Sequence, residues 1–100
     1  MIEKLYQYTT EATDLFEPII KEDDFELNHV FIKPGKFFPK HPTDAEVTII
    51  VIRGELSITL GDQDKKVYPK GSVIRAPLGS PSVLGNDYLK TTEVFVIKRR

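Results

Sequence analysis

The chain of 100 residues contains no cysteine, no tryptophan and only one methionine. The absence of cysteine excludes disulfide bonds, thiolate metal sites and cysteine nucleophiles. No apolar run approaches the roughly 18 residues that a membrane-spanning helix needs, and the N-terminus lacks the hydrophobic stretch of a signal peptide. We therefore expect a cytoplasmic protein that does not bind a membrane.

An excess of charge of either sign is also absent. Fourteen Lys and Arg residues oppose fifteen Asp and Glu residues, so the net charge is −1. This balance argues against a nucleic-acid-binding surface, and the basic tail at 98–100 is too short to create one. The chain also lacks a glycine-rich phosphate loop, an HExxH zinc motif and a GxSxG nucleophile elbow.

Short runs rich in Val, Ile, Thr, Phe and Tyr alternate with prolines and glycines along the chain. This pattern is typical of a β-sandwich or β-barrel. Residues 25–32 alternate with period two, and we expect the more apolar face, which carries His29, to point inward. Residues 47–52 are apolar on both faces and indicate a central strand. Further strands are predicted at 56–60, 67–68, 72–76 and 92–97.

The N-terminal part differs from the rest of the chain. Residues 15–20 carry apolar side chains at helical spacing, but Pro18 interrupts them, so we expect at most a short helical turn. The sequence predicts an N-terminal arm at 1–24 and a barrel at 25–97, within a single domain that spans 1–100.

Two clusters of turn residues enclose the central strands. Gly35, His41 after five intervening residues, and Gly54 form the first cluster. The second begins at Pro69-Lys70-Gly71 and ends at Asn86. In this order and spacing, the segment 34–86 resembles the two motifs of the cupin superfamily. The resemblance implies an all-β, single-domain antiparallel jelly-roll barrel, in agreement with the strand pattern.

The same resemblance implies that most of a cupin metal site is missing. Metal-binding cupins hold a divalent transition metal with three histidines and one glutamate. The corresponding positions here are His41, Thr43, Val47 and Ser82, so only His41 retains a ligand side chain. Because such sites normally need at least three protein ligands, we do not expect the usual metal to bind.

Two residues outside those positions offer an alternative metal site. Glu46 precedes the glutamate position by one residue and would face the cavity only if a bulge or a shorter loop shifted the register. His29 would share the cavity with His41 if its face of the strand points inward. A metal-dependent enzyme of dioxygenase or isomerase type would then hold its ion with His41, Glu46 and His29. A solvated loop for Glu46 and a hydrogen-bonded core position for His29 explain both residues without a metal.

The barrel interior is either a filled core or a pocket. We expect a pocket that binds a small molecule of unknown identity, with Val47 in its wall and His41, Thr43 and Ser82 as polar anchors. A further hypothesis is a regulatory or structural module that acts through a partner chain. Since cupins of this size usually pair, a homodimer is also expected. The sequence names no substrate and leaves enzymatic activity open.

Overall fold

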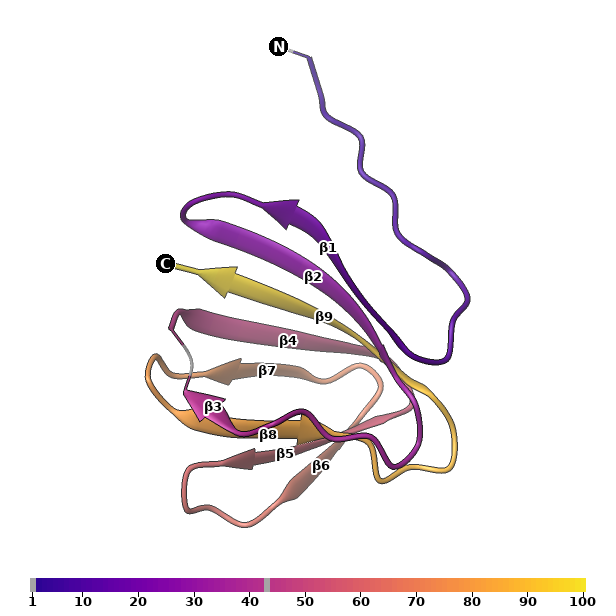
Figure 1. Cartoon of the computed structure of the whole chain (residues 1–100), viewed down its shortest axis with the longest axis vertical. Coiled ribbons are helices and arrows are strands. Elements are labelled where there is room, and N and C mark those ends of the chain that lie inside the picture. Colours follow the sequence, from indigo (N-terminus) through magenta and orange to yellow (C-terminus); the bar gives the residue numbers. More distant parts are fainter. Residues whose placement is uncertain (1, 43) are drawn as a thin grey trace.

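The computed structural model describes residues 2–42 and 44–100, and this part of the chain forms nine strands (Figure 1). In chain order they are β1 (Leu15–Lys21), β2 (Phe25–Ile32), β3 (His41–Pro42), β4 (Glu46–Arg53), β5 (Glu55–Leu60), β6 (Lys66–Pro69), β7 (Val73–Ala76), β8 (Pro81–Gly85) and β9 (Thr92–Arg99).

The strands form two antiparallel sheets that enclose a common core (Figure 1). The five-stranded sheet has the order β1-β2-β9-β4-β7, and the four-stranded sheet has the order β3-β8-β5-β6. Strands far apart in sequence are therefore neighbours, as β2 and β9 are, which is the connectivity of a jelly-roll barrel. The predicted all-β barrel is confirmed, and the described residues include no helix.

The core lies between the two sheets, where β2, β4, β5, β7 and β9 contribute alternate side chains. The odd-numbered residues of β4 point inward, as the motif spacing predicts, and so do the even-numbered residues of β2 and β9. The buried core cluster comprises Val30, Ile32, Val47, Ile49, Val51, Leu56, Ile58, Ala76, Val94 and Val96.

The predicted orientation of β2 is wrong. Val30 and Ile32 belong to the core, so the alternate face, which carries His29 and Phe31, points to the outer side of the five-stranded sheet. That side is also covered, because the end of the N-terminal arm places Tyr8 against His29. Both faces of β2 are therefore buried. For this reason the apolar content of a face does not identify which face of β2 packs against the core.

Strand β1 forms where the sequence predicted at most a helical turn, so the barrel begins at residue 15 and not at residue 25. Pro18 fits this strand because β1 is an edge strand whose pairing with β2 is irregular between Pro18 and Ile20. The arm is correspondingly shorter than expected, and its first residues run away from the barrel (Figure 1).

Two of the motif residues have structural roles at the turns. Gly54 adopts a positive φ of 78°, and a Cβ there would lie 2.7 Å from Oγ1 of Thr92, so a larger residue would be both strained and crowded. The side chain of Asn86 donates hydrogen bonds to the carbonyl oxygens of Ile32 and Lys90, and its oxygen accepts one from the backbone N–H of Tyr88. The resemblance to cupins at these positions thus reflects the turns of the fold.

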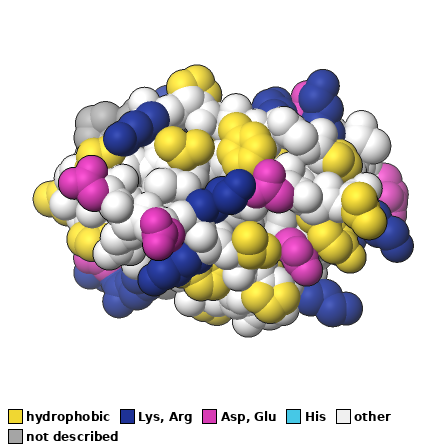
Figure 2. Space-filling view, turned by 90° about the horizontal axis from the view of Figure 1, so that it is seen from below, with side chains coloured by type: hydrophobic (Ala, Val, Ile, Leu, Met, Phe, Trp, Pro, Cys, Tyr) yellow, Lys and Arg dark blue, Asp and Glu magenta, His cyan; other side chains and the backbone are white. Residues whose placement is uncertain are grey.

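The outer surface of the barrel is mixed. Seen from below, hydrophobic side chains lie scattered among lysines, arginines and acidic residues (Figure 2). Within the described ranges, no helix is both long and apolar enough to cross a membrane.

Candidate functional site

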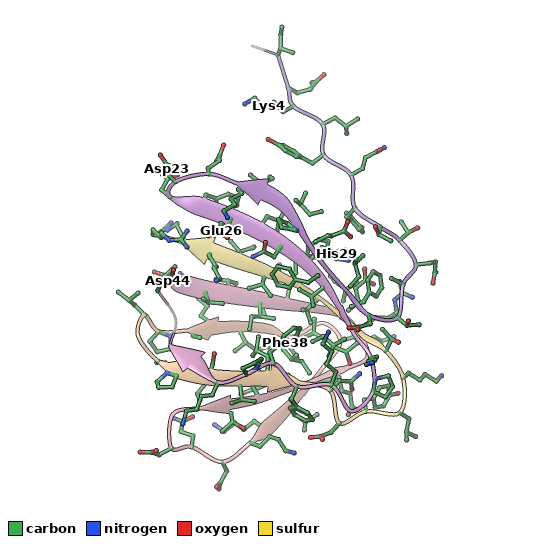
Figure 3. All side chains as sticks on the ribbon, viewed as in Figure 1. Lys4, Asp23, Glu26, His29, Phe38 and Asp44 are labelled. Carbon is green, nitrogen blue, oxygen red and sulfur yellow. The ribbon has the colours of Figure 1, made fainter. Side chains whose placement is uncertain are left out.

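Two adjoining cavities lie between the sheets. The larger has a volume of about 340 Å³ and the smaller about 50 Å³. The larger is lined by Phe16, Asn28, Val30, Ile32, Phe38, Pro39, Leu84, Val94, Val96 and Lys98. The smaller is lined by Val47, Ile49, Ile58, Leu60, Ile74, Ala76, Ser82, Leu84, Val96 and Lys98. Because Leu84, Val96 and Lys98 belong to both linings, we treat the two cavities as one interior site; Figure 3 labels Phe38 between the sheets.

The structure brings two of the predicted pocket residues together in this site. Val47 comes from β4 in the five-stranded sheet, and Ser82 comes from β8 in the opposite sheet. The backbone of His41 in β3 pairs with Ser82, but the side chain of His41 lies outside the described part of the structure. Thr43 lies wholly outside it.

Glu46 does not reach the interior. Its neighbour Val47 lines the smaller cavity, and adjacent side chains of a strand point to opposite faces. The pairing of β4 with β9 is regular from Glu46 to Val51, so no bulge re-orients the carboxylate. Glu46 instead forms an ion pair with the exposed Arg75. The hypothesis that a register shift turns Glu46 into the cavity is therefore wrong.

His29 also lies outside the barrel interior, on the side of the five-stranded sheet where the arm crosses it (Figure 3). It is 0% exposed and lies between two carboxylates. Its Nδ1 is 2.8 Å from Oε2 of Glu17, and its Nε2 is 2.6 Å from Oε2 of Glu93. Both ring nitrogens of His29 therefore lie within hydrogen-bond distance of a carboxylate oxygen.

Each of the two carboxylates beside His29 accepts further hydrogen bonds. The side chain of Glu93 is 3% exposed. Its other oxygen, Oε1, accepts hydrogen bonds from Nη2 of Arg53 at 2.9 Å and from Nε of Arg53 at 3.0 Å. The carboxylate of Glu17 accepts hydrogen bonds from the backbone N–H and from the hydroxyl of Thr9. The hydrogen bond from His29, supported by those from Thr9, holds the pKa of Glu17 below its ordinary value.

Aromatic rings surround the imidazole at the centre of this network. The ring of His29 lies 4.7 Å from that of Tyr8, 4.9 Å from that of Phe31 and 4.8 Å from that of Phe95, measured between centroids. Tyr8 also meets Phe95 edge to face at 5.1 Å. Tyr8 and Thr9 belong to the arm, so the arm is fixed to the barrel at the buried histidine.

The described residues do not fit the metal of the metal-binding cupins. The glutamate position holds Val47, which is part of the core, and Ser82 occupies a histidine position. Glu17 and Glu93 contact opposite nitrogens of His29, so these three side chains cannot converge on one ion. Among the described side chains, which exclude that of His41, no group of three His, Asp or Glu residues is placed to hold a metal. The alternative site with His41, Glu46 and His29 is therefore not formed, because His29 and Glu46 lie outside the interior.

Sequence reasoning missed two polar residues of the interior site, Asn28 and Lys98. Both continue the alternation that selects the core, since Asn28 precedes Val30 by two residues and Lys98 follows Val96 by two. The correct face of β2 would have revealed Asn28. A final strand drawn through residue 99 would have revealed Lys98.

Comparison with known proteins gives a consistent result, although no protein-family model matches the chain. A curated protein of Methanocaldococcus jannaschii, named only as uncharacterized, is 31% identical over 99 residues, which cover 98% of this chain and 85% of that protein. The crystal structure of an RmlC-like cupin family protein from the same organism, with a double-stranded β-helix fold, has a TM-score of 0.94 and 30% identity. The match covers 99% of this chain and 92% of that one.

More distant structures share the fold alone. A cupin superfamily protein from Desulfitobacterium hafniense has a TM-score of 0.79 at 15% identity, with 93% of this chain and 83% of that one covered. The cupin domain of an XRE family transcriptional regulator from Enterobacter cloacae has a TM-score of 0.76 at 16% identity, with 89% and 98% covered. From its near-complete match to the M. jannaschii protein and from its jelly-roll architecture, we conclude that the chain belongs to the RmlC-like cupin family.

Proposed function

We propose that the protein binds a small organic molecule in the interior site between its two sheets. The observation that carries the proposal is the predominantly apolar lining of the larger cavity between the sheets, whose volume of about 340 Å³ also lies within the range of roughly 300–1,000 Å³ typical of small-molecule sites. The cavity is partly open to the surface, with the exposed Phe16 in its lining, so a ligand can enter it. A cavity of this size inside a barrel of 100 residues therefore supports a binding role.

The lining of the site favours an apolar ligand held by few polar contacts. Phe16, Phe38 and the aliphatic side chains of β2, β8 and β9 form most of the wall. Asn28, Ser82 and Lys98 supply polar groups, and such a combination is typical of ligand pockets. The proposed role involves no metal, since the described residues do not fit one.

Filling the cavity tests the proposal. Leu84 lines both cavities, so the variant Leu84→Phe should occupy space that a ligand needs, at little cost to folding. Val67→Phe makes the matched change on exposed strand β6, outside either cavity. Binding is measured by ligand-detected NMR with a library of small apolar and amphipathic molecules, followed by titration calorimetry of the hits.

The original protein and Val67→Phe should bind the same hits with equal affinity, and Leu84→Phe should weaken binding tenfold or more. A ligand present at 100 times its dissociation constant should also stabilise the folded protein by about 2.7 kcal/mol, visible as a rise in Tm. No hit from the library, or hits that bind Leu84→Phe as well as the original protein, would contradict the proposal.

A further inference from the structure

Polar groups inside the barrel differ from those elsewhere in the chain because three of them have no partner. The amide of Asn28, the hydroxyl of Ser82 and the ammonium of Lys98 have no hydrogen-bond or ion-pair partner among the described residues. Asn28 is only 3% exposed and Ser82 only 5%. Unpartnered polar groups on the wall of one cavity are available to a ligand that enters it.

The rest of the described structure supports this interpretation. Other buried polar side chains are fully engaged, as Asn86, His29 and Thr92 are. No side-chain nitrogen or oxygen that is completely enclosed lacks a partner in the described ranges. The polar atoms of Asn28 and Ser82 must therefore retain access to the cavity, where a ligand can reach them.

Lys98 gives the site its sign of charge. No Asp or Glu residue is among the lining of either cavity, and Lys98 is the charged residue common to both. Lys98 acts electrostatically on Asp44, whose pKa is lowered first by Arg100 and also by Lys98. Arg100 contacts Glu26, which lies opposite Lys98 in strand register, at 2.6 Å, and Asp44 at 3.2 Å. Because Arg100 makes the direct contacts to Glu26 and Asp44, and Lys98 forms no ion pair of its own among the described residues, its ammonium can bind an anion brought by the ligand.

We propose that the interior site selects a molecule with an apolar body and a single carboxylate. The carboxylate of the ligand accepts hydrogen bonds from the ammonium of Lys98 and from the side-chain amide of Asn28. Asn28 lies diagonal to Lys98 on the neighbouring strand. The apolar body lies against Phe16, Phe38 and the valines of β9. This inference rests on the proposed function and adds the chemical class of the ligand.

The test compares two probes of nearly the same shape, 3-phenylpropionate and 3-phenylpropanamide, in which a neutral amide replaces the charged carboxylate. Each is titrated by calorimetry into the original protein and into Lys98→Met, which keeps an unbranched apolar side chain one atom shorter and removes the charge. Lys66→Met, on exposed strand β6, is the matched control. A charge-assisted hydrogen bond in a partly buried site corresponds to roughly a tenfold change in affinity or more.

The original protein and Lys66→Met should bind the carboxylate at least tenfold more tightly than the amide. Lys98→Met should lose that preference while it keeps its affinity for the amide probe. Asn28→Leu should lower the affinity for the carboxylate probe more than the affinity for the amide probe. If both probes bind equally, and their binding is unchanged in Lys98→Met but reduced in Leu84→Phe, the proposed selection for a carboxylate is overturned. The proposal that the site binds a small molecule would then still stand. Binding of neither these probes nor any library compound would overturn both proposals.

Discussion

Glu17 is the partly exposed end of the buried charge network, and its role depends on pH. Its pKa is lowered in the folded protein, first by the hydrogen bond from His29, so its ionised form stabilises the fold. That contribution is fully present above the ordinary pKa of 4.5 and is lost as the pH falls through the lowered value. Gln at this position cannot ionise, so Glu17→Gln should destabilise the protein by about 1–3 kcal/mol at pH 7.

The difference in unfolding free energy between Glu17→Gln and the original protein should shrink toward zero as the pH is lowered below 4.5. Denaturant unfolding monitored by circular dichroism at several pH values measures it. Glu46→Gln is the matched control, because its ion pair with Arg75 is exposed and is worth about 0–1 kcal/mol. A constant difference for Glu17→Gln down to pH 3 would show that the carboxylate is not held in its charged form by His29.

At the scale of the structural elements, β1, β2 and β4 show what the sequence could and could not predict. The strands at 25–32 and 47–52 follow directly from alternation and β-branched content, and they appear within one residue of the expected ends. The orientation of the first was not predictable from its own residues, since the arm buries its outer face. Strand β1 was missed because Pro18 argues against a regular strand, and only an edge position with a bulge accommodates it.

The same limit applied to the candidate site. Val47 and Ser82 were placed by motif spacing, which turns and hairpins determine locally. The partners of His29 were not predictable, because Glu17, Glu93 and Arg53 come from three different strands whose pairing is a property of the whole barrel.

The arm itself depends on one aromatic contact. Tyr8 packs on His29 and Phe95, and the next residue donates two hydrogen bonds to Glu17. Tyr8→Ala should therefore release the arm, with loss of protection of the Thr9 amide in hydrogen exchange measured by NMR. Tyr6→Ala removes a ring from the same arm that has no ring contact in the described structure, and it should leave that amide protected. Equal exchange of the Thr9 amide in both variants would contradict a role of Tyr8 as the anchor.

At the scale of the whole molecule, the outer side of the five-stranded sheet carries apolar residues that its own chain covers only in part. Alternation places Leu27, Ile50 and Ile97 there, in addition to Phe95 of the aromatic cluster at His29. The arm extends past the edge strand β1 (Figure 1), and it exposes Ile2 by 91% and Leu5 by 82%. An apolar face and an apolar arm on one chain suit a second copy related by two-fold symmetry, because each arm can then cover the partner's sheet.

We therefore expect a homodimer, with a mass by light scattering of twice that of the chain at micromolar concentration. Ile97→Lys places a charge in the middle of the outer face, away from the core, and should give a folded monomer. Leu89→Lys makes a comparable change on the loop between β8 and β9 and should remain dimeric. Removal of residues 2–6 should weaken the dimer without affecting the contacts of Tyr8 and Thr9, since those residues stay in place. A monomeric original protein would refute the dimer, whereas a dimer that withstands Ile97→Lys would place the interface on another face of the barrel.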